Sequence, residues 1–156
     1  MPRHLTREQE ERFMGWARER DRLILELQSA SIPEKVQAYK QLEKRILKEA
    51  STAFEKQEMR RRITEDLLMA TMVGSWRGFS PYLRRMERLG YSSMDGRLLI
   101  CAWAAQASKG SVAGVRKTAA LIADFERRLR GRKVPPGLRE QIDVILTRAR
   151  KSAGLG

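Results

Sequence analysis

The sequence has almost none of the side chains that enzymes use for acid–base, nucleophilic or metal chemistry. Its only histidine, His4, lies at the N-terminus, and its only cysteine, Cys101, lies inside the most apolar stretch. A single cysteine excludes a disulfide framework, and without a nearby histidine it is not an activated nucleophile. The sequence also lacks a paired Cys or His set, a Gly-rich phosphate loop and a nucleophile elbow. We therefore predict no enzymatic activity, no catalytic residue, no metal and no cofactor.

Carboxylates offer the remaining route to metal-dependent catalysis, as in a nuclease, but their spacing is unfavourable. Asp124 and Glu126 are two residues apart and so face different sides of a helix. The pair Glu65 and Asp66, and the single Asp95, form no better cluster. A carboxylate-dependent nuclease is therefore the weaker interpretation.

Long hydrophobic runs are also absent. No apolar run approaches the roughly 18–20 residues that span a bilayer, so we expect no membrane segment. No hydrophobic segment follows residues 1–4, so we expect no secretory signal. Together with the single cysteine, these features predict a cytoplasmic location.

Acidic residues are scarce in the second half of the chain. Residues 1–72 carry 15 basic and 13 acidic side chains, whereas residues 73–156 carry 17 basic and 6 acidic ones. A soluble surface needs only a modest net charge with both signs mixed, and the first half fits that description. Most of the net charge of +13 therefore lies in the second half, which predicts a polyanionic partner for that half, either RNA or DNA.

Cap signals place two helical regions in the first half. Thr6 with Gln9 forms a capping box for a helix that extends to about residue 29. Ser31, followed by Pro in the first turn, begins a second region that has no further Gly or Pro until residue 74. This second region is either one helix of about 40 residues or two helices broken near residues 51–52 or 57. With the first helix it forms a hairpin.

Glycine and proline divide the second half. Gly74–Phe79 is the main break in the chain, and Ser80 with Pro81 begins a short helix that Gly90 closes. Further helices follow at about 112–130 and 138–150. Between them, Leu98–Ala105 is an unbroken apolar run in a chain where 33% of the residues are charged.

The apolar run predicts a central helix over about 93–109 that is buried on nearly all sides at its middle. Ser92 with Asp95 is its candidate N-cap, and Gly110 its candidate C-cap. The predicted fold is therefore an all-α helical bundle of about six helices. Residues 1–73 form a long N-terminal helical hairpin for self-association or docking. Residues 74–156 form a compact basic helical subdomain around the helix 93–109.

Basic residues gather on two helices of this subdomain. In the helix 112–130, the wheel at about 100° per residue separates an apolar arc from a basic arc. A second basic cluster lies on the helix that follows Ser80. A row of like charges repels itself unless a polyanion is present. We predict that nucleic acid contacts Arg77, Arg84, Arg85, Arg88, Arg116, Lys117, Arg127, Arg128, Arg130, Arg132 and Lys133.

Four aromatic residues lie beside the second basic cluster. Basic side chains interleaved with aromatic ones can stack unpaired bases. We interpret Trp76 and Phe79 as anchors of the Gly-rich segment, and Tyr82 and Tyr91 as candidates for base stacking.

The sequence is similar in size, helical content and basicity to the small helical subunits of CRISPR effector complexes, which line the nucleic-acid path. Many phage and plasmid DNA-binding proteins share the same general features. Residues 81–105 also have the order helix, short turn, helix of a DNA-binding helix-turn-helix, although most of the second helix is too apolar to lie in a groove.

We therefore predict a non-catalytic nucleic-acid-binding protein that holds the phosphate backbone largely without sequence specificity, as a subunit of a larger nucleoprotein assembly. The helices of residues 6–72 would bind a protein partner or a second copy of the chain. The alternatives are an adaptor whose basic half binds an acidic protein, and a helix-turn-helix regulator. Attachment to a membrane surface is disfavoured, because the helix 112–130 has few large apolar residues on its basic side.

Overall fold

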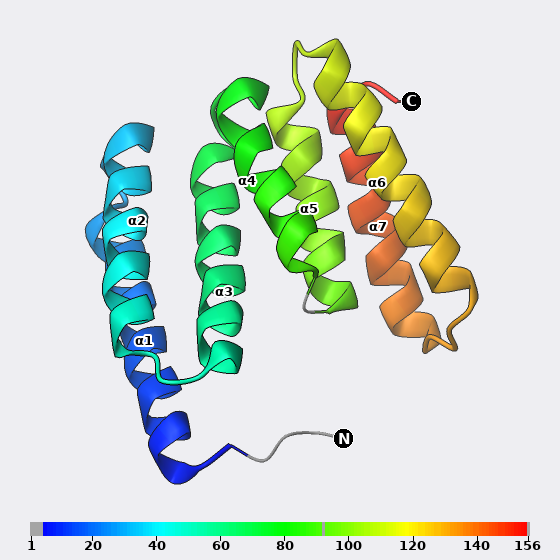
Figure 1. Cartoon of the computed structure of the whole chain (residues 1–156). Helices are drawn as coiled ribbons and strands as arrows, with labels where there is room; N and C mark the ends of the chain where they lie inside the picture. The colour runs from blue at the N-terminus through cyan, green and yellow to red at the C-terminus, as the bar shows by residue number, and fades with distance from the viewer. Residues whose placement is uncertain (1–4, 92, 156) are drawn as a thin grey trace. The chain divides into compact units, whose positions relative to one another are not determined.

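The computed structural model describes residues 5–91 and 93–155, and over these residues the regular secondary structure is helical, with no strand. The prediction of an all-α helical bundle is confirmed. The chain divides into two compact units, residues 1–59 and residues 60–156. The described helices are α1 (Arg7–Glu26), α2 (Ile32–Glu49), α3 (Ala53–Thr71), α4 (Trp76–Leu89), α5 (Met94–Ala107), α6 (Val112–Arg130) and α7 (Pro136–Ser152), labelled in Figure 1.

The first unit contains α1, α2 and the beginning of α3. Both predicted caps are present: Thr6 forms a capping box with Gln9, and the Ser31 hydroxyl accepts the backbone N–H of Glu34. The second helical region is broken at residues 50–52, which decides between the alternatives that the sequence left open. The buried apolar side chains of the unit are Phe13, Trp16, Tyr39, Leu42, Ile46, Ala50 and Met59.

A buried carboxylate connects α1 to the start of α3 within the first unit. Glu55 is 0% exposed, and its carboxylate accepts hydrogen bonds from Arg12 Nε at 3.0 Å and Arg12 Nη2 at 2.9 Å. The hydroxyl of Ser51 donates to the same carboxylate at 2.9 Å. Removing a carboxylate from water is expensive, so these donors are what make its burial tolerable.

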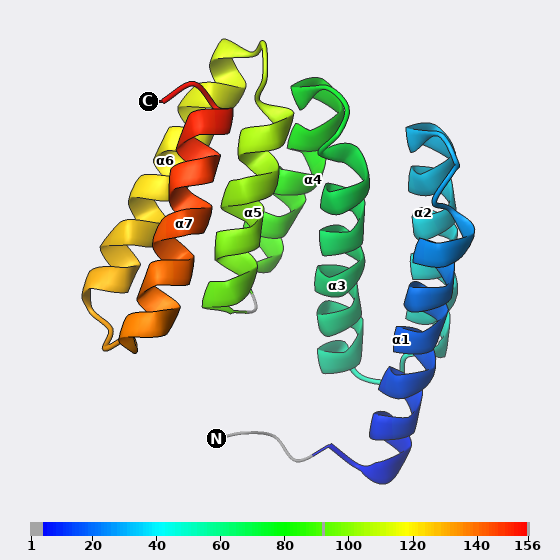
Figure 2. The ribbon, with the colours of Figure 1, turned by 180° about the vertical axis from the view of Figure 1, so that it is seen from behind.

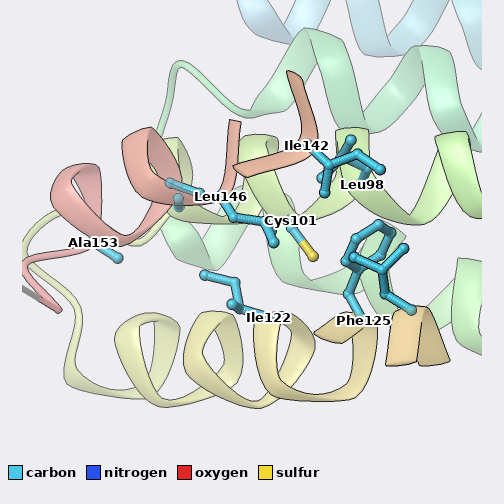
Figure 3. Packing of buried hydrophobic residues seen from close by; sticks show 10 residues of the cluster. Leu98, Cys101, Ile122, Phe125, Ile142, Leu146 and Ala153 are labelled. Carbon is cyan, nitrogen blue, oxygen red and sulfur yellow. The ribbon is translucent and has the colours of Figure 1, made fainter. Parts of the chain in front are cut away.

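The second unit is organised around α5. This helix contacts α4, α6 and α7, and its side chains contribute to two apolar clusters, one facing α6 and α7 and the other facing α3 and α4. Figure 3 shows the first cluster, in which Cys101 points between Ile122 and Phe125 of α6 and Leu146 of α7. Burial on nearly all sides is too strong a prediction, because Leu99 is 46% exposed.

The start of α4 differs from the prediction. The helix begins at Trp76 with Ser75 as its N-cap, and not at Ser80, so Pro81 lies inside the helix. Phe79 is fully buried in the α3–α4–α5 cluster, and the Trp76 ring packs against that cluster. Burial of these aromatic side chains therefore extends the helix across Gly78, within the segment that the sequence pattern marked as a break.

The ends of the remaining helices agree closely with the cap signals. Gly90 follows α4 with φ +83°, and α6 covers the predicted residues and ends before Gly131. The N-cap of α5 is Ser93, whose hydroxyl accepts the N–H of Gly96 at 3.0 Å. Ser92, the predicted cap, lies outside the described residues. The C-cap of α5 is Ser108, and Gly110 turns the chain at φ +77°.

The division of the chain into two units falls after Met59, within α3, whereas the sequence pattern places its boundary at residues 73–74. Leu68, in the second half of α3, packs with Phe79, Leu83 and Ile100 of the second unit. The C-terminal part of α3 therefore belongs to the same compact unit as the basic helices. A Gly-rich break in the sequence does not reveal this packing.

Gly114 lies where α6 passes close to Ser108 and Trp76. A Cβ atom there would lie 2.9 Å from Ser108 Cα and 2.9 Å from Trp76 Cδ2. We expect Gly114→Ala to lower the stability of this unit by about 1 kcal/mol, because overpacking costs about 1–3 kcal/mol and the gain in helix propensity is at most about 1 kcal/mol.

Gly15, within α1, is the matched control for Gly114. A Cβ atom there meets nothing within 4 Å, so Gly15→Ala should raise stability by up to about 1 kcal/mol. Calorimetric melting shows whether each substitution lowers or raises the stability of the folded chain. Equal stabilisation by the two substitutions would contradict the close packing at Gly114.

Candidate nucleic-acid interface

The predicted basic residues lie on α4, on α6 and on the segment after α6. Figure 1 shows α4 and α6 nearer the viewer than α5 and α7, and Figure 2, seen from behind, reverses that order. Two side chains of α4 reach the first two turns of α6: Trp76 lies beside Gly114, and Glu87 pairs with Lys117. The two clusters that the sequence pattern indicated are therefore brought together on one layer of the second unit.

The exposed stripe of α6 is basic at its ends and small in its middle. Arg116, Ala120, Ala123, Arg127 and Arg130 follow one another at helical spacing, and all are exposed. The opposite arc of the same helix is buried against α5 and α7. The separation of a basic from an apolar arc, predicted from the sequence, is present in the structure.

On α4, three exposed cations share one stripe. Arg84 and Arg88 are four residues apart, and Arg77 lies about two turns before Arg84 on the same side of the helix. Arg84 is also one turn before Glu87, which contacts α6. Arg85 is half-buried and has its own interactions within the chain.

Acidic residues neutralise part of the predicted set. Lys117 pairs with Glu87, with Nζ 2.9 Å from Oε1. Asp124 accepts hydrogen bonds from both Arg127 and Arg128, the latter at 2.9 Å, and it also lies 3.7 Å from Arg97 Nη1. The hydrogen bond from Arg128 is the main reason that the pKa of Asp124 is lowered, so this group is a carboxylate at neutral pH.

These pairs leave the cations accessible. The side chains of Arg127 and Arg128 are 71% and 46% exposed. Exposed ion pairs contribute only about 0–1 kcal/mol, so a phosphate group can compete with Asp124 for both guanidinium groups.

Apart from Arg85, the remaining predicted cations have no acidic partner within residues 5–91 and 93–155. We call these residues the basic surface. They are Arg77, Arg84, Arg88, Arg116, Arg130, Arg132 and Lys133.

Both tyrosines proposed for base stacking are half-buried. Tyr82 and Tyr91 pack against the apolar cluster between α4 and α5. The guanidinium group of Arg97 covers one face of the Tyr91 ring, at 4.2 Å from the ring centroid. Burial, followed by the nearby charge of Glu87, raises the pKa of Tyr91 to about 12.

Trp76 and Phe79 pack on one another and on the core, with ring centroids 5.5 Å apart, as expected of anchors.

Arg97 was not among the predicted contacts, although it lies at the centre of this region. It connects Tyr91, before α5, to Asp124 of α6. Its position in an otherwise apolar helix was the only sequence signal that could have identified it.

Cys101 is a buried core residue. Desolvation raises the pKa of its thiol from 9.0 to about 12, so the reactive thiolate is not formed at neutral pH.

We expect a disulfide reagent at pH 8 to modify Cys101 in the folded chain at least about a hundredfold more slowly than in the urea-unfolded chain. A comparable rate in both states would contradict this burial. The Cys101→Ala variant, which has no thiol, measures the background signal of the reagent.

The described residues offer neither a metal site nor a membrane-spanning helix. No three His, Cys, Asp or Glu side chains in that part of the chain are grouped so that they could hold a metal ion. None of the described helices combines the length and the apolar character needed to cross a bilayer. His4 lies outside the described residues.

Comparison with protein-family models, with curated proteins and with solved structures gives no significant match to this chain. The similarity to CRISPR subunits therefore stays a prediction.

Proposed function

We propose that this chain is a non-catalytic nucleic-acid-binding protein that holds the phosphate backbone largely without sequence specificity, as a subunit of a larger nucleoprotein assembly. The observation that carries the proposal is the basic surface, whose cations have no acidic partner in the described part of the chain. Residues 60–156 contain 20 basic and 8 acidic side chains, whereas residues 1–59 contain 12 and 11.

Phosphate is the anion that fits this surface best. Arginine predominates, and its planar fork forms two parallel hydrogen bonds with a phosphate group. Between Arg116 and Arg127 the exposed stripe carries only Ala120 and Ala123, so a strand can approach the helix closely. Without a polyanion the like charges on α4 and α6 repel one another, and a bound strand relieves this repulsion.

Contact with the backbone is favoured over reading of bases by α5. In a helix-turn-helix the second helix enters the major groove, but α5 packs against α4, α6 and α7. Of its first residues, Asp95 is exposed, and Arg97 is held by Tyr91 and Asp124. These contacts leave few polar side chains on α5 to reach base edges.

The first unit supplies a surface for a protein partner or a second copy of the chain. Met14 and Leu25 of α1 are 56% and 68% exposed, and their spacing of eleven residues places them on the same side of the helix. The single buried cysteine is consistent with a reducing, cytoplasmic setting.

The proposal is tested by measuring binding of the full chain to labelled RNA, single-stranded DNA and duplex DNA of equal length at low salt. Poly-glutamate serves as an acidic polypeptide for comparison. We expect binding to nucleic acid with affinities that vary by less than about tenfold between sequences. Binding to poly-glutamate alone would overturn the proposal in favour of an adaptor for an acidic protein. Strong preference for one duplex sequence would favour a helix-turn-helix regulator.

A further inference from the structure

The second unit contains a polar hollow of about 340 Å³ beside the start of α5 and the end of α6. Its lining comes from the first turns of α5, from the last turn of α6, and from the segments that precede α5 and follow α6. We call it the arginine hollow. Its lining residues are Tyr91, Ser93, Met94, Arg97, Arg128 and Arg132.

Two of its arginines are held in place before any ligand arrives. The Arg97 guanidinium lies on the Tyr91 ring and 3.7 Å from Asp124 Oδ2, and Arg128 Nε donates to the same oxygen at 2.9 Å. Because each guanidinium has five N–H donors, both groups keep donors for a further anion. Arg132 is exposed and has no partner in the described part of the chain.

The charges around the hollow favour a dianion over a monoanion. Three guanidinium groups line it and no carboxylate does, although Asp124 pairs with two of these groups and Asp95 lines the hollow that adjoins it. A phosphate monoester carries about −1.5 to −2 charges at pH 7, whereas each internal phosphate of a strand carries only one. The first turn of α5, capped by Ser93, adds the partial positive charge of a helix N-terminus.

A second, more apolar hollow of about 200 Å³ adjoins the first. Met94 and Arg132 line both hollows, so a ligand can occupy them together. Pro135 and Leu138 form its exposed edge, and Phe125 and Leu129 form part of its floor. An anionic group joined to a flat apolar group, as in a nucleotide, matches this pair of hollows.

We propose that the arginine hollow binds the terminal phosphate monoester of a nucleic-acid strand, with the attached nucleotide against Pro135 and Leu138. This inference deepens the proposed function and rests on it for the identity of the strand. The same chemistry is present in a free nucleoside monophosphate, so the experiment has to separate a strand end from a free nucleotide.

The test compares a single-stranded oligonucleotide carrying a 5′-phosphate, the same oligonucleotide with a 5′-hydroxyl, and a third form with a 3′-phosphate, at constant ionic strength. We expect one phosphorylated end to bind about tenfold more tightly than the hydroxyl form, since its added charge meets the hollow. Arg132→Ala should remove this preference, and Arg132→Lys should restore part of it.

Arg130→Ala is the matched control. Arg130 is also exposed, unpaired within the described residues and close in sequence, but it does not line the hollow. This variant should weaken binding of all three oligonucleotides equally and keep the preference. Thermal melting of each variant confirms that the fold is retained.

The outcomes separate this inference from the proposed function. Equal binding of all three oligonucleotides, or a preference that persists in Arg132→Ala, would overturn the assignment of the hollow while leaving backbone binding intact. If no oligonucleotide binds, but adenosine monophosphate binds in an Arg132-dependent way and adenosine does not, the hollow holds a free phosphate monoester and the proposed function fails.

Discussion

Replacing Arg84, Arg116 and Arg130 together by alanine should weaken nucleic-acid binding about a hundredfold. Each exposed contact between a guanidinium group and a phosphate contributes about 1 kcal/mol, and three such losses multiply to about that factor. These arginines are exposed and have no ion pair in the described ranges, so their removal breaks no contact that supports the fold. Fluorescence anisotropy with a labelled oligonucleotide measures the change.

A triple variant on α7 controls for net charge. Arg139→Ala, Arg148→Ala and Lys151→Ala remove the same charge from exposed positions on the helix that lies behind α6 in Figure 1. Its affinity should stay within about threefold of the original chain. If both triple variants lose affinity equally, binding depends on overall charge, and the assignment of the α4–α6 layer is wrong.

Replacing Glu55 by alanine should destabilise the first unit by about 3 kcal/mol. The change removes a carboxylate that is 0% exposed and leaves the donors of Arg12, Ser51 and Thr52 without their acceptor. Breaking a buried ion pair by removing one partner costs about 3–5 kcal/mol, and the partial exposure of Arg12 places the effect at the lower end. A urea titration that follows unfolding of the first unit measures it.

The stabilisation by Glu55 should disappear in acid. The hydrogen bond from Arg12 is the main cause that lowers the pKa of Glu55 from 4.5 to about 2. Since the folded-state pKa lies below the unfolded one, the contribution is complete above pH 4.5 and is lost as the pH falls towards 2. The stability difference between the original chain and Glu55→Gln should therefore shrink over this range. A difference that stays constant from pH 6 to pH 2 would contradict the pairing.

Local signals in the sequence predicted most helix boundaries because they act within one turn. The Thr6 capping box, the restart at Ser31 and the ends of α4 and α6 all depend on residues at most four positions apart. The start of α4 could not be predicted in this way. Ser80 with Pro81 is a good local start signal, but burial of Phe79 against residues distant in sequence outweighs it.

The sequence indicated which basic residues form the candidate interface, but not which of them pair with acidic residues. Helical periodicity was sufficient to separate the basic arc of α6 from its buried arc. Periodicity could not indicate that Glu87, thirty residues earlier, pairs with Lys117, because that contact depends on how α4 packs beside α6. The same packing brings Arg97, Arg128 and Arg132 around one hollow.

The salt dependence of nucleic-acid binding tests the central claim most directly. Binding to the phosphate backbone releases counterions, so the logarithm of the dissociation constant should rise linearly with the logarithm of salt concentration, with a slope of about 4 if most of the basic surface is engaged. The variant lacking Arg84, Arg116 and Arg130 should show a slope lower by about 3. A slope below about 1 for the original chain, or an identical slope for the variant, would contradict the account.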